Sequence, residues 1–152
     1  MNGVAYAKSF RDLITYQKAR NLQREVFKLT LTFPKDERFS LTDQVRRSSR
    51  SIGANIAEAW AKRRYPNHFL SKLTDAEGEE FETLHWIGTA VDCEYLDSEK
   101  AKPFIAKCEE IGRMLGSMME KADLFCGEEY RTRSVGEAQA DYFADSPDVT
   151  EY

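Results

Sequence analysis

Apolar residues recur at alternating steps of four and three over residues 104–125, and this spacing constrains the fold more than any other feature of the chain. The residues that follow it are Phe104, Cys108, Ile111, Leu115, Met118, Ala122 and Phe125. Such spacing gives an α-helix one apolar seam and is typical of helices that pack at about +20° in a bundle. The alternation of apolar and polar residues that marks β-strands does not occur.

Three further segments have helical periodicity, and prolines help to delimit them. We predict helices over about 10–32, 40–64 and 68–95, followed by a fourth from 97 or 98 to about 126. Pro34 and Pro66 lie in two of the predicted loops, where proline favours a helix end. Short loops between long helices make neighbours antiparallel. The predicted fold class is therefore all-α, an antiparallel up-down-up-down four-helix bundle.

Local signals place the starts of two helices. Ser40 is the predicted N-cap of the second helix, and Asp43 three residues later makes a variant of the capping box. Asp97 and Ser98 are cap candidates for the fourth helix, in which Pro103 is expected to lie in the first turn. These boundaries predict an N-terminal arm at 1–9, a bundle domain at 10–126 and an acidic C-terminal tail at 127–152.

The length and the cysteine content agree with one reduced, cytoplasmic domain. A chain of 152 residues buries enough surface to fold without disulfides or metal ions. The three cysteines are odd in number and form no C-x-x-C pair, so we interpret them as free thiols. No apolar run approaches the roughly 20 residues of a membrane helix. We therefore expect a cytoplasmic protein with no membrane partner.

The net charge of −4 is an average over regions of opposite sign. Residues 8–32 and 40–64 each hold six basic and two acidic residues, which gives +4 for each segment. Residues 67–95 hold seven acids and one base, and residues 127–152 hold seven acids and two bases, which gives −6 and −5. The negative net charge of the whole chain consequently does not argue against a polyanionic partner, because two of the predicted helices are basic.

The basic residues of the first two helices form candidate binding rows. They are Arg20, Arg24 and Lys28 in the first helix and Arg46, Arg47 and Arg50 in the second. Alanines continue the second row, and guanidinium groups above small residues form a surface that a phosphate backbone can approach. A solvated face, or neutralisation by the acidic third helix, would also account for these charges. Charge alone leaves both interpretations open, and no motif of stacking aromatic residues accompanies the arginines.

The first helix carries two apolar stripes where a bundle helix needs one. Leu22, Val26, Leu29 and Phe33 form the stripe that we expect to face the core. A second stripe, together with a tryptophan off the core face of the third helix, suggests contact with another subunit rather than scattered surface apolar residues. The candidate oligomer interface is Leu13, Tyr16, Phe27, Leu31 and Trp86.

Acidic residues of the third helix raise the question of an enzyme. Glu77 and Glu80 fall on its apolar stripe, where a buried carboxylate needs a partner such as Asn55, Arg46, Arg47 or Arg113. Glu82 and His85 have the Glu-x-x-His spacing of di-iron bundles, but the second copy that such a site requires is missing. There is also no phosphate-binding loop or nucleophile motif. We expect no catalytic residue, no metal and no cofactor.

The segment from Phe33 to Glu58, FPKDERFSLTDQVRRSSRSIGANIAE, resembles the signature of a bacterial "four helix bundle protein" family. Further matches are Phe10-Arg11-Asp12-Leu13, Phe69-Leu70 and Arg113-Met114-Leu115, so the resemblance covers about residues 10–125. The family includes proteins encoded in intervening sequences of 23S rRNA genes, sometimes called ribosomal-protein-like. It is similar to the accessory variability determinant proteins of diversity-generating retroelements.

The resemblance implies an antiparallel four-helix bundle that assembles into a ring-like homopentamer. For the retroelement relatives it also implies a basic surface that binds nucleic acid and a reverse transcriptase as partner. Arg46, Arg47 and Arg50 stand where the family motif has its arginines, so binding is carried over to those positions. Asn55 and Glu58 are interpreted as members of a structural polar network, to which we add Glu77 and Glu80.

The sequence thus predicts a non-enzymatic oligomer, most simply a pentamer, that acts as a nucleic-acid- or RNP-associated accessory factor. Its candidate partners are further copies of itself, RNA or DNA, and a reverse transcriptase or other protein. The alternative is an oligomeric scaffold that binds only proteins, through the acidic third helix and tail. We also hypothesise that the acidic tail masks the basic helices, in which case its deletion should raise nucleic-acid affinity.

Overall fold

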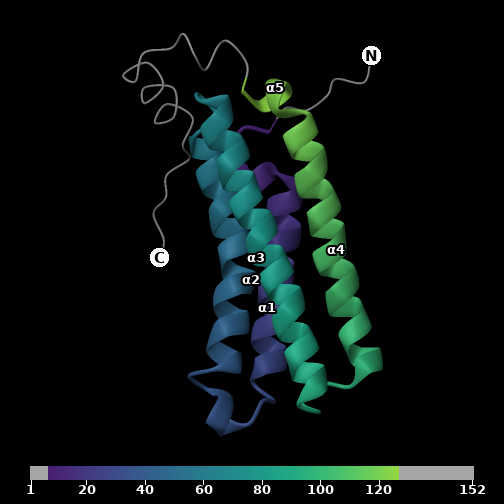
Figure 1. Cartoon of the computed structure of the whole chain (residues 1–152). Helices are drawn as coiled ribbons and strands as arrows, with labels where there is room; N and C mark the ends of the chain where they lie inside the picture. Colours follow the sequence, from purple (N-terminus) through teal and green to yellow (C-terminus); the bar gives the residue numbers. More distant parts are fainter. Residues whose placement is uncertain (1–6, 127–152) are drawn as a thin grey trace.

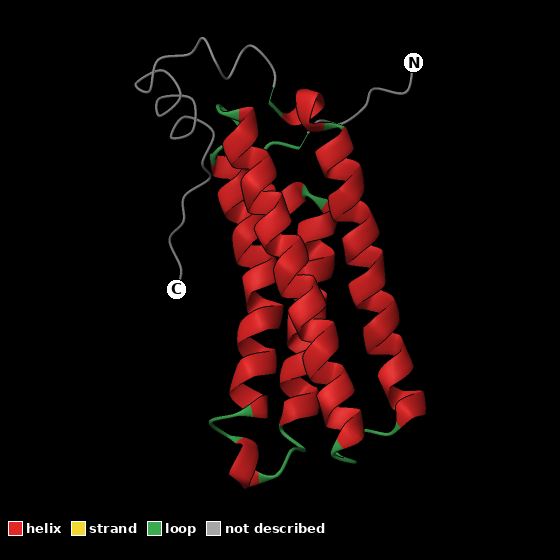
Figure 2. Ribbon diagram, viewed as in Figure 1, coloured by secondary structure: helices red, strands yellow, loops and turns green. Residues whose placement is uncertain are grey.

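The computed structural model describes residues 7–126, and every regular element among them is helical (Figure 2). The elements are α1 (Ile14–Thr30), α2 (Leu41–Ala61), α3 (Pro66–Asp92), α4 (Ser98–Glu120) and α5 (Ala122–Phe125), with 3-10 turns at Phe10–Asp12 and Lys35–Glu37. The all-helical class is as predicted. The acidic tail and the first six residues of the predicted arm lie outside the described residues. The hypothesis that the tail masks the basic helices concerns these residues.

The four long helices lie side by side as a bundle (Figure 1). Helix α1 packs against α2 and α4, and α3 packs against the same two helices. The core lies along the axis that the four helices share. Its largest fully buried side chains come from all four, among them Leu22, Ile52, Phe69 and Leu115.

The predicted apolar stripes of α2 and α4 are confirmed as core. In α2 the buried stripe is Leu41, Val45, Ser49, Ile52, Ile56 and Ala59, and in α4 it includes Cys108, Ile111, Leu115 and Met118. Small polar residues serve close packing between α2 and α3, where the Thr83 hydroxyl donates to Ser48 Oγ over 2.9 Å in the buried interface. Helical periodicity therefore located most of the interior correctly.

The predicted first helix is interrupted at its start. Ser9 Oγ accepts from the amide of Arg11, and the Asp12 carboxylate accepts from the amide of Ser9, so a capping box closes the turn at Phe10–Asp12. Leu13 follows with an extended backbone (ψ 124°), and α1 begins only at Ile14. One continuous helix over 10–32 is thus wrong, because this short turn has its own cap.

Ser40 is the N-cap residue of α2, as predicted, but its side chain makes no capping hydrogen bond, so the predicted capping box does not form. Glu37 takes that role from the preceding 3-10 turn. Its Oε2 accepts from the amide of Leu41 over 3.0 Å and from the Ser40 hydroxyl over 2.6 Å, while its Oε1 accepts from the Tyr95 hydroxyl over 3.0 Å. These bonds, led by the one from Ser40, hold the pKa of Glu37 below its ordinary value. One carboxylate thereby joins the start of α2 to the loop after α3.

Replacing this carboxylate should weaken the fold in a pH-dependent way. We expect Glu37→Gln to lower the urea midpoint at neutral pH, since the amide keeps one acceptor and loses the charge-assisted bonds. A carboxyl whose pKa is lowered by folding stabilises the protein above its unfolded pKa and loses that effect as the pH falls. The difference from the wild type, followed by circular dichroism, should therefore shrink toward acid pH. Equal midpoints at neutral pH would contradict the assigned cap.

Two more boundaries differ from the predicted ones. Helix α3 ends at Asp92 and not at residue 95, because Glu94 adopts a left-handed conformation (φ 61°) without the glycine that usually signals one. Helix α4 begins at Ser98, as predicted, and Asp97 Oδ1 accepts from the amide of Glu99 over 2.7 Å, but the helix ends at Glu120 and not near residue 126. Pro103 therefore lies beyond the first turn, on an exposed position where the helix tolerates its missing amide.

Candidate functional site

The basic row of α1 is exposed along its whole length. Arg20, Arg24 and Lys28 succeed one another at helical spacing of four, which keeps them on one side of the helix. Arg20 Nη1 donates to the Tyr16 hydroxyl over 3.2 Å. The side chains of Arg24 and Lys28 form no hydrogen bond or ion pair with any residue between 7 and 126. Their charges are thus available to a partner.

The three arginines of α2 point in different directions. Arg46 is half-buried against α1, where its Nε donates to Thr30 Oγ1 over 2.7 Å. Arg47 Nη2 reaches α3 and forms an ion pair with Glu82 Oε1 over 2.8 Å. Arg50 is exposed and has no side-chain partner among the described residues. The structure therefore brings Arg46 against α1, turns Arg47 toward α3 and leaves Arg50 in solvent.

An aromatic residue that the sequence did not connect with the arginines lies beside Arg46. The Arg46 guanidinium carbon is 4.8 Å from the centre of the Phe27 ring, and Phe27 remains 42% exposed. A cation above a ring face is an attractive arrangement, and an exposed ring can also stack on a nucleobase. The pair joins two helices, so no local motif could have revealed it. The sequence predicts Phe27 only as a member of the oligomer interface.

The second apolar stripe of the first helix is less exposed than its spacing predicted. Leu13 belongs to the core at 8% exposure, which its extended backbone before α1 explains. Tyr16 is half-buried and packs edge-on against Phe10. Trp86 is also half-buried against the core. Phe27 and Leu31 are the members of the predicted interface that stay exposed, and Ile14, which was not predicted, is exposed at the opposite end of α1.

The four residues of the predicted polar network do not meet at one place. Asn55 Nδ2 donates to the Ser51 carbonyl within α2, and Glu58 forms an ion pair with Lys72 of α3 over 3.1 Å. Glu77 and Glu80 lie farther along α3, in the wall of a groove between α3 and α4. None of the predicted partners of Glu80 bonds to it.

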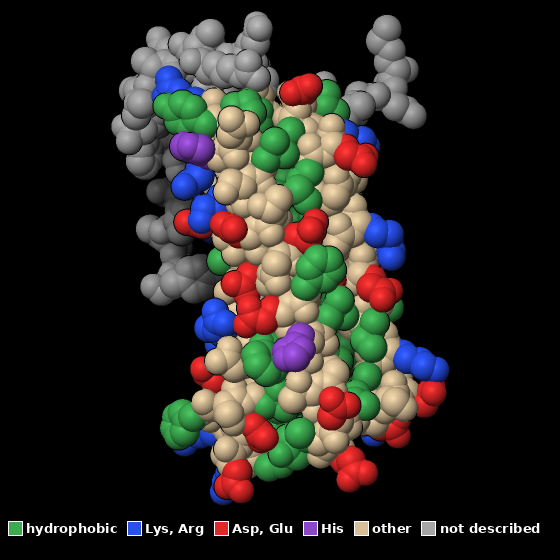
Figure 3. All heavy atoms as spheres, in the orientation of Figure 1, with side chains coloured by type: hydrophobic (Ala, Val, Ile, Leu, Met, Phe, Trp, Pro, Cys, Tyr) green, Lys and Arg blue, Asp and Glu red, His purple; other side chains and the backbone are tan. Residues whose placement is uncertain are grey.

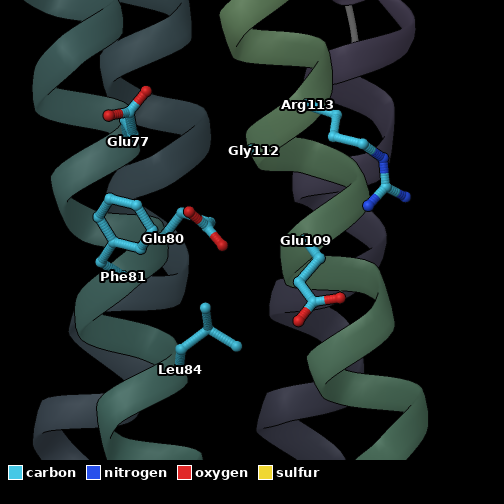
Figure 4. Close-up of a pocket in the computed structure, with 7 residues that line it drawn as sticks. All are labelled: Glu77, Glu80, Phe81, Leu84, Glu109, Gly112 and Arg113. Carbon is cyan, nitrogen blue, oxygen red and sulfur yellow. The ribbon is translucent and has the colours of Figure 1, made fainter.

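The groove carries acidic residues from both of its helices (Figure 4). Asp and Glu side chains are also prominent on the face formed by α3 and α4 (Figure 3). Burial, followed by the charges of Glu77 and Glu109, raises the pKa of Glu80 to about 7. Burial and the nearby Glu80 and Glu109 likewise raise the pKa of the Cys108 thiol to about 12, which keeps it protonated.

The pKa of Glu80 predicts a dependence of stability on pH. Because it is raised from 4.5 to about 7, the folded protein binds more protons than the unfolded chain between these values, and stability falls as the pH rises through them. We expect Glu80→Gln to match the wild type near pH 4.5 and to exceed it at pH 8 by about 2 kcal/mol. Urea unfolding of both proteins measures this difference. A difference that does not change with pH would contradict it.

The other sites considered from the sequence are occupied by structural contacts. Glu82 Oε1 accepts from Arg47 Nη2 of α2 and from Trp86 Nε1 of α3. The glutamate of the Glu-x-x-His segment therefore joins α3 to α2. Within residues 7–126 no three His, Cys, Asp or Glu side chains are grouped so that they could hold a metal ion. The helices of that range also contain no segment of the length and apolarity needed to cross a membrane.

Comparisons with known proteins agree on one family. The family model described as "23S rRNA-intervening sequence protein" matches residues 11–117. A crystal structure from Bacteroides thetaiotaomicron, of a protein with unknown function from the S23 ribosomal protein family, is similar with a TM-score of 0.64 and 27% identity. The match covers 70% of this chain and 98% of that one. No curated protein matches the sequence.

Proposed function

The chain belongs to the family of 23S rRNA-intervening sequence proteins, and on that premise we propose that it is a non-enzymatic accessory factor that binds nucleic acid. The proposed contact surface, the α1–α2 basic face, consists of Arg20, Arg24, Lys28 and Arg50. One observation carries the proposal. These four cations are exposed, and three of them have no partner among the described residues.

The proposal takes the bundle as antiparallel, with an up-down-up-down course. Contacts between α1 and α2 support this direction, since Thr30 at the end of α1 meets Arg46 near the start of α2. Tyr16, near the start of α1, lies beside Gly53 in the second half of α2. Interpolating between these contacts places Arg24 at about the level of Arg50. We infer that the exposed cations of the two helices form one surface at this level.

Free cations are the feature that nucleic-acid binding requires. Each Lys or Arg that neutralises a phosphate releases a condensed counterion, and this release supplies most of the sequence-independent affinity. An arginine already paired with a carboxylate, such as Arg47 with Glu82, has less to contribute. The overall charge of −4 does not oppose binding here, because the acids are concentrated in other segments.

Phe27 extends the same surface with a group that can contact bases. Base stacking on an aromatic side chain contributes about 1–3 kcal/mol per base and depends little on sequence. Arg46 covers part of the ring and leaves 42% of the side chain exposed. The combination of cations and one aromatic platform favours a single-stranded segment over a regular duplex, whose bases are already stacked.

A direct binding experiment tests the proposal. We expect a fluorescently labelled single-stranded RNA to bind the full chain at low salt, and the variant Arg24/Lys28/Arg50→Gln to bind at least tenfold more weakly. The matched control, Lys35/Lys100/Lys121→Gln, removes three exposed charges elsewhere and should retain its affinity. Fluorescence anisotropy measures both, and DNA of the same sequence addresses preference. If the wild type does not bind at low salt, the alternative of a purely protein-binding scaffold is favoured.

We also propose that the chain is a homo-oligomer, as the pentamer implied by the family resemblance would require. Phe27 in the last turn of α1 and Leu31 just after it are exposed apolar residues four positions apart, and they support an apolar contact with another subunit. Light scattering should give a mass several times 17.5 kDa at micromolar concentration. A monomer under these conditions would refute the assembly and leave the proposed nucleic-acid surface to its own test.

A further inference from the structure

A groove of about 450 Å³ lies between α3 and α4, away from the α1–α2 basic face. Its volume falls in the range of small-molecule sites, roughly 300–1,000 Å³. Phe81 and Leu84 supply apolar surface, and Glu77, Glu80 and Glu109 supply carboxylates. The groove therefore combines an apolar wall with negative charge.

Glu80 is the unusual member of this groove. Its side chain is only 2% exposed, yet it forms no hydrogen bond or ion pair with any residue in the described range. Figure 4 shows its carboxyl group projecting from α3 toward α4. Buried carboxyl groups are ordinarily hydrogen-bonded or paired, because burial without a partner is costly. Glu80 is thus a buried acceptor directed into an open groove.

The opposite helix makes room for this carboxyl group. A Cβ atom at Gly112 would lie 3.2 Å from Glu80 Oε2, which is closer than most such contacts. Glycine at this position lets α4 approach the carboxylate without covering it. Arg113 lines the same groove, but its side chain points away from Glu80 and forms no ion pair with it (Figure 4). The one basic residue among those that line the groove therefore leaves the carboxylate unneutralised.

We propose that this groove binds a linear alkylammonium ion, with the ammonium group on Glu80 and the alkyl stem along Phe81 and Leu84. An ammonium group offers three donors to carboxylate oxygens, and its charge offsets the repulsion among Glu77, Glu80 and Glu109. The stem covers Phe81, which is 60% exposed in its absence. An organic ammonium ion fits this groove better than a metal ion, since the carboxylates are not grouped as ligands within the described residues.

Calorimetric titration of the full chain with 1,5-diaminopentane tests the proposal. We expect saturable binding by the wild type and at least tenfold weaker binding by Glu80→Gln, which preserves shape and removes the charge. Glu120→Gln changes the net charge equally at an exposed position of α4 outside the groove and should bind like the wild type. 1-Pentanol, which has the same five-carbon stem without an ammonium group, should not bind detectably.

A second variant keeps the test independent of any effect of Glu80 on folding. Phe81→Ala removes the exposed apolar wall without touching a charge, and we expect it to weaken diamine binding several-fold. No binding of the diamine at millimolar concentration, or equal binding by the wild type and both groove variants, would overturn the assignment. Neither result bears on nucleic-acid binding, because the two surfaces share no residue.

Discussion

Phe69→Ala is expected to lower the free energy of unfolding by about 3–5 kcal/mol, the range found for large buried aromatic residues. Phe69 in α3 is fully buried, and its ring stacks on Phe125 with 5.6 Å between the ring centres. The truncation would leave a cavity at the point where α3 holds α5 against the bundle. Urea denaturation followed by circular dichroism measures the loss as a lower midpoint with an unchanged slope.

Phe81→Ala is the matched control for this substitution. It makes the same chemical change in the same helix, at a position that is 60% exposed. We expect it to alter stability by no more than about 0.5 kcal/mol, as surface substitutions usually do. Similar losses for the two variants would contradict the arrangement of α3 that places one phenylalanine inside the bundle and the other at its surface.

The affinity for RNA should fall steeply as salt is added. If the four cations of the α1–α2 basic face each contact a phosphate of single-stranded RNA, the logarithm of the association constant falls with a slope of about −2.8 against the logarithm of salt concentration. Raising the salt from about 50 to 200 mM would then weaken binding about 50-fold. Fluorescence anisotropy titrations across this range measure the slope. A slope near zero would mean that phosphate contacts do not supply the affinity.

The helical periods of the sequence were sufficient to predict most of the core. The seam of α4 and the stripe of α2 were confirmed because both follow from the pitch of an α-helix alone. Three local features were missed. Leu13 breaks the first helix after a separately capped turn, Glu37 caps α2 from outside it, and Glu94 ends α3 with a positive φ. Each depends on contacts or backbone angles that residue types do not specify.

The candidate sites were predictable only in part. The spacing of the cations predicts that they lie on the outer sides of α1 and α2. The direction in which each side chain points depends on the residues that the neighbouring helix offers. Arg47 turned to Glu82 of α3, and Arg46 turned to Phe27 of α1. Glu80 was predicted to be buried with a partner, and it is buried without one, because Gly112 faces it where a longer side chain could have bonded to it. Such outcomes depend on which residues oppose one another between helices.

The central claim, that the α1–α2 basic face binds nucleic acid, is tested most directly by comparing salt slopes. The measurement is the slope for one single-stranded RNA with the wild type and with Arg24/Lys28/Arg50→Gln. Since each lost phosphate contact reduces the slope by about 0.7, we predict a fall in magnitude from about 2.8 to about 0.7. Equal slopes for the two proteins would contradict the claim, because the RNA phosphates would then contact some other surface.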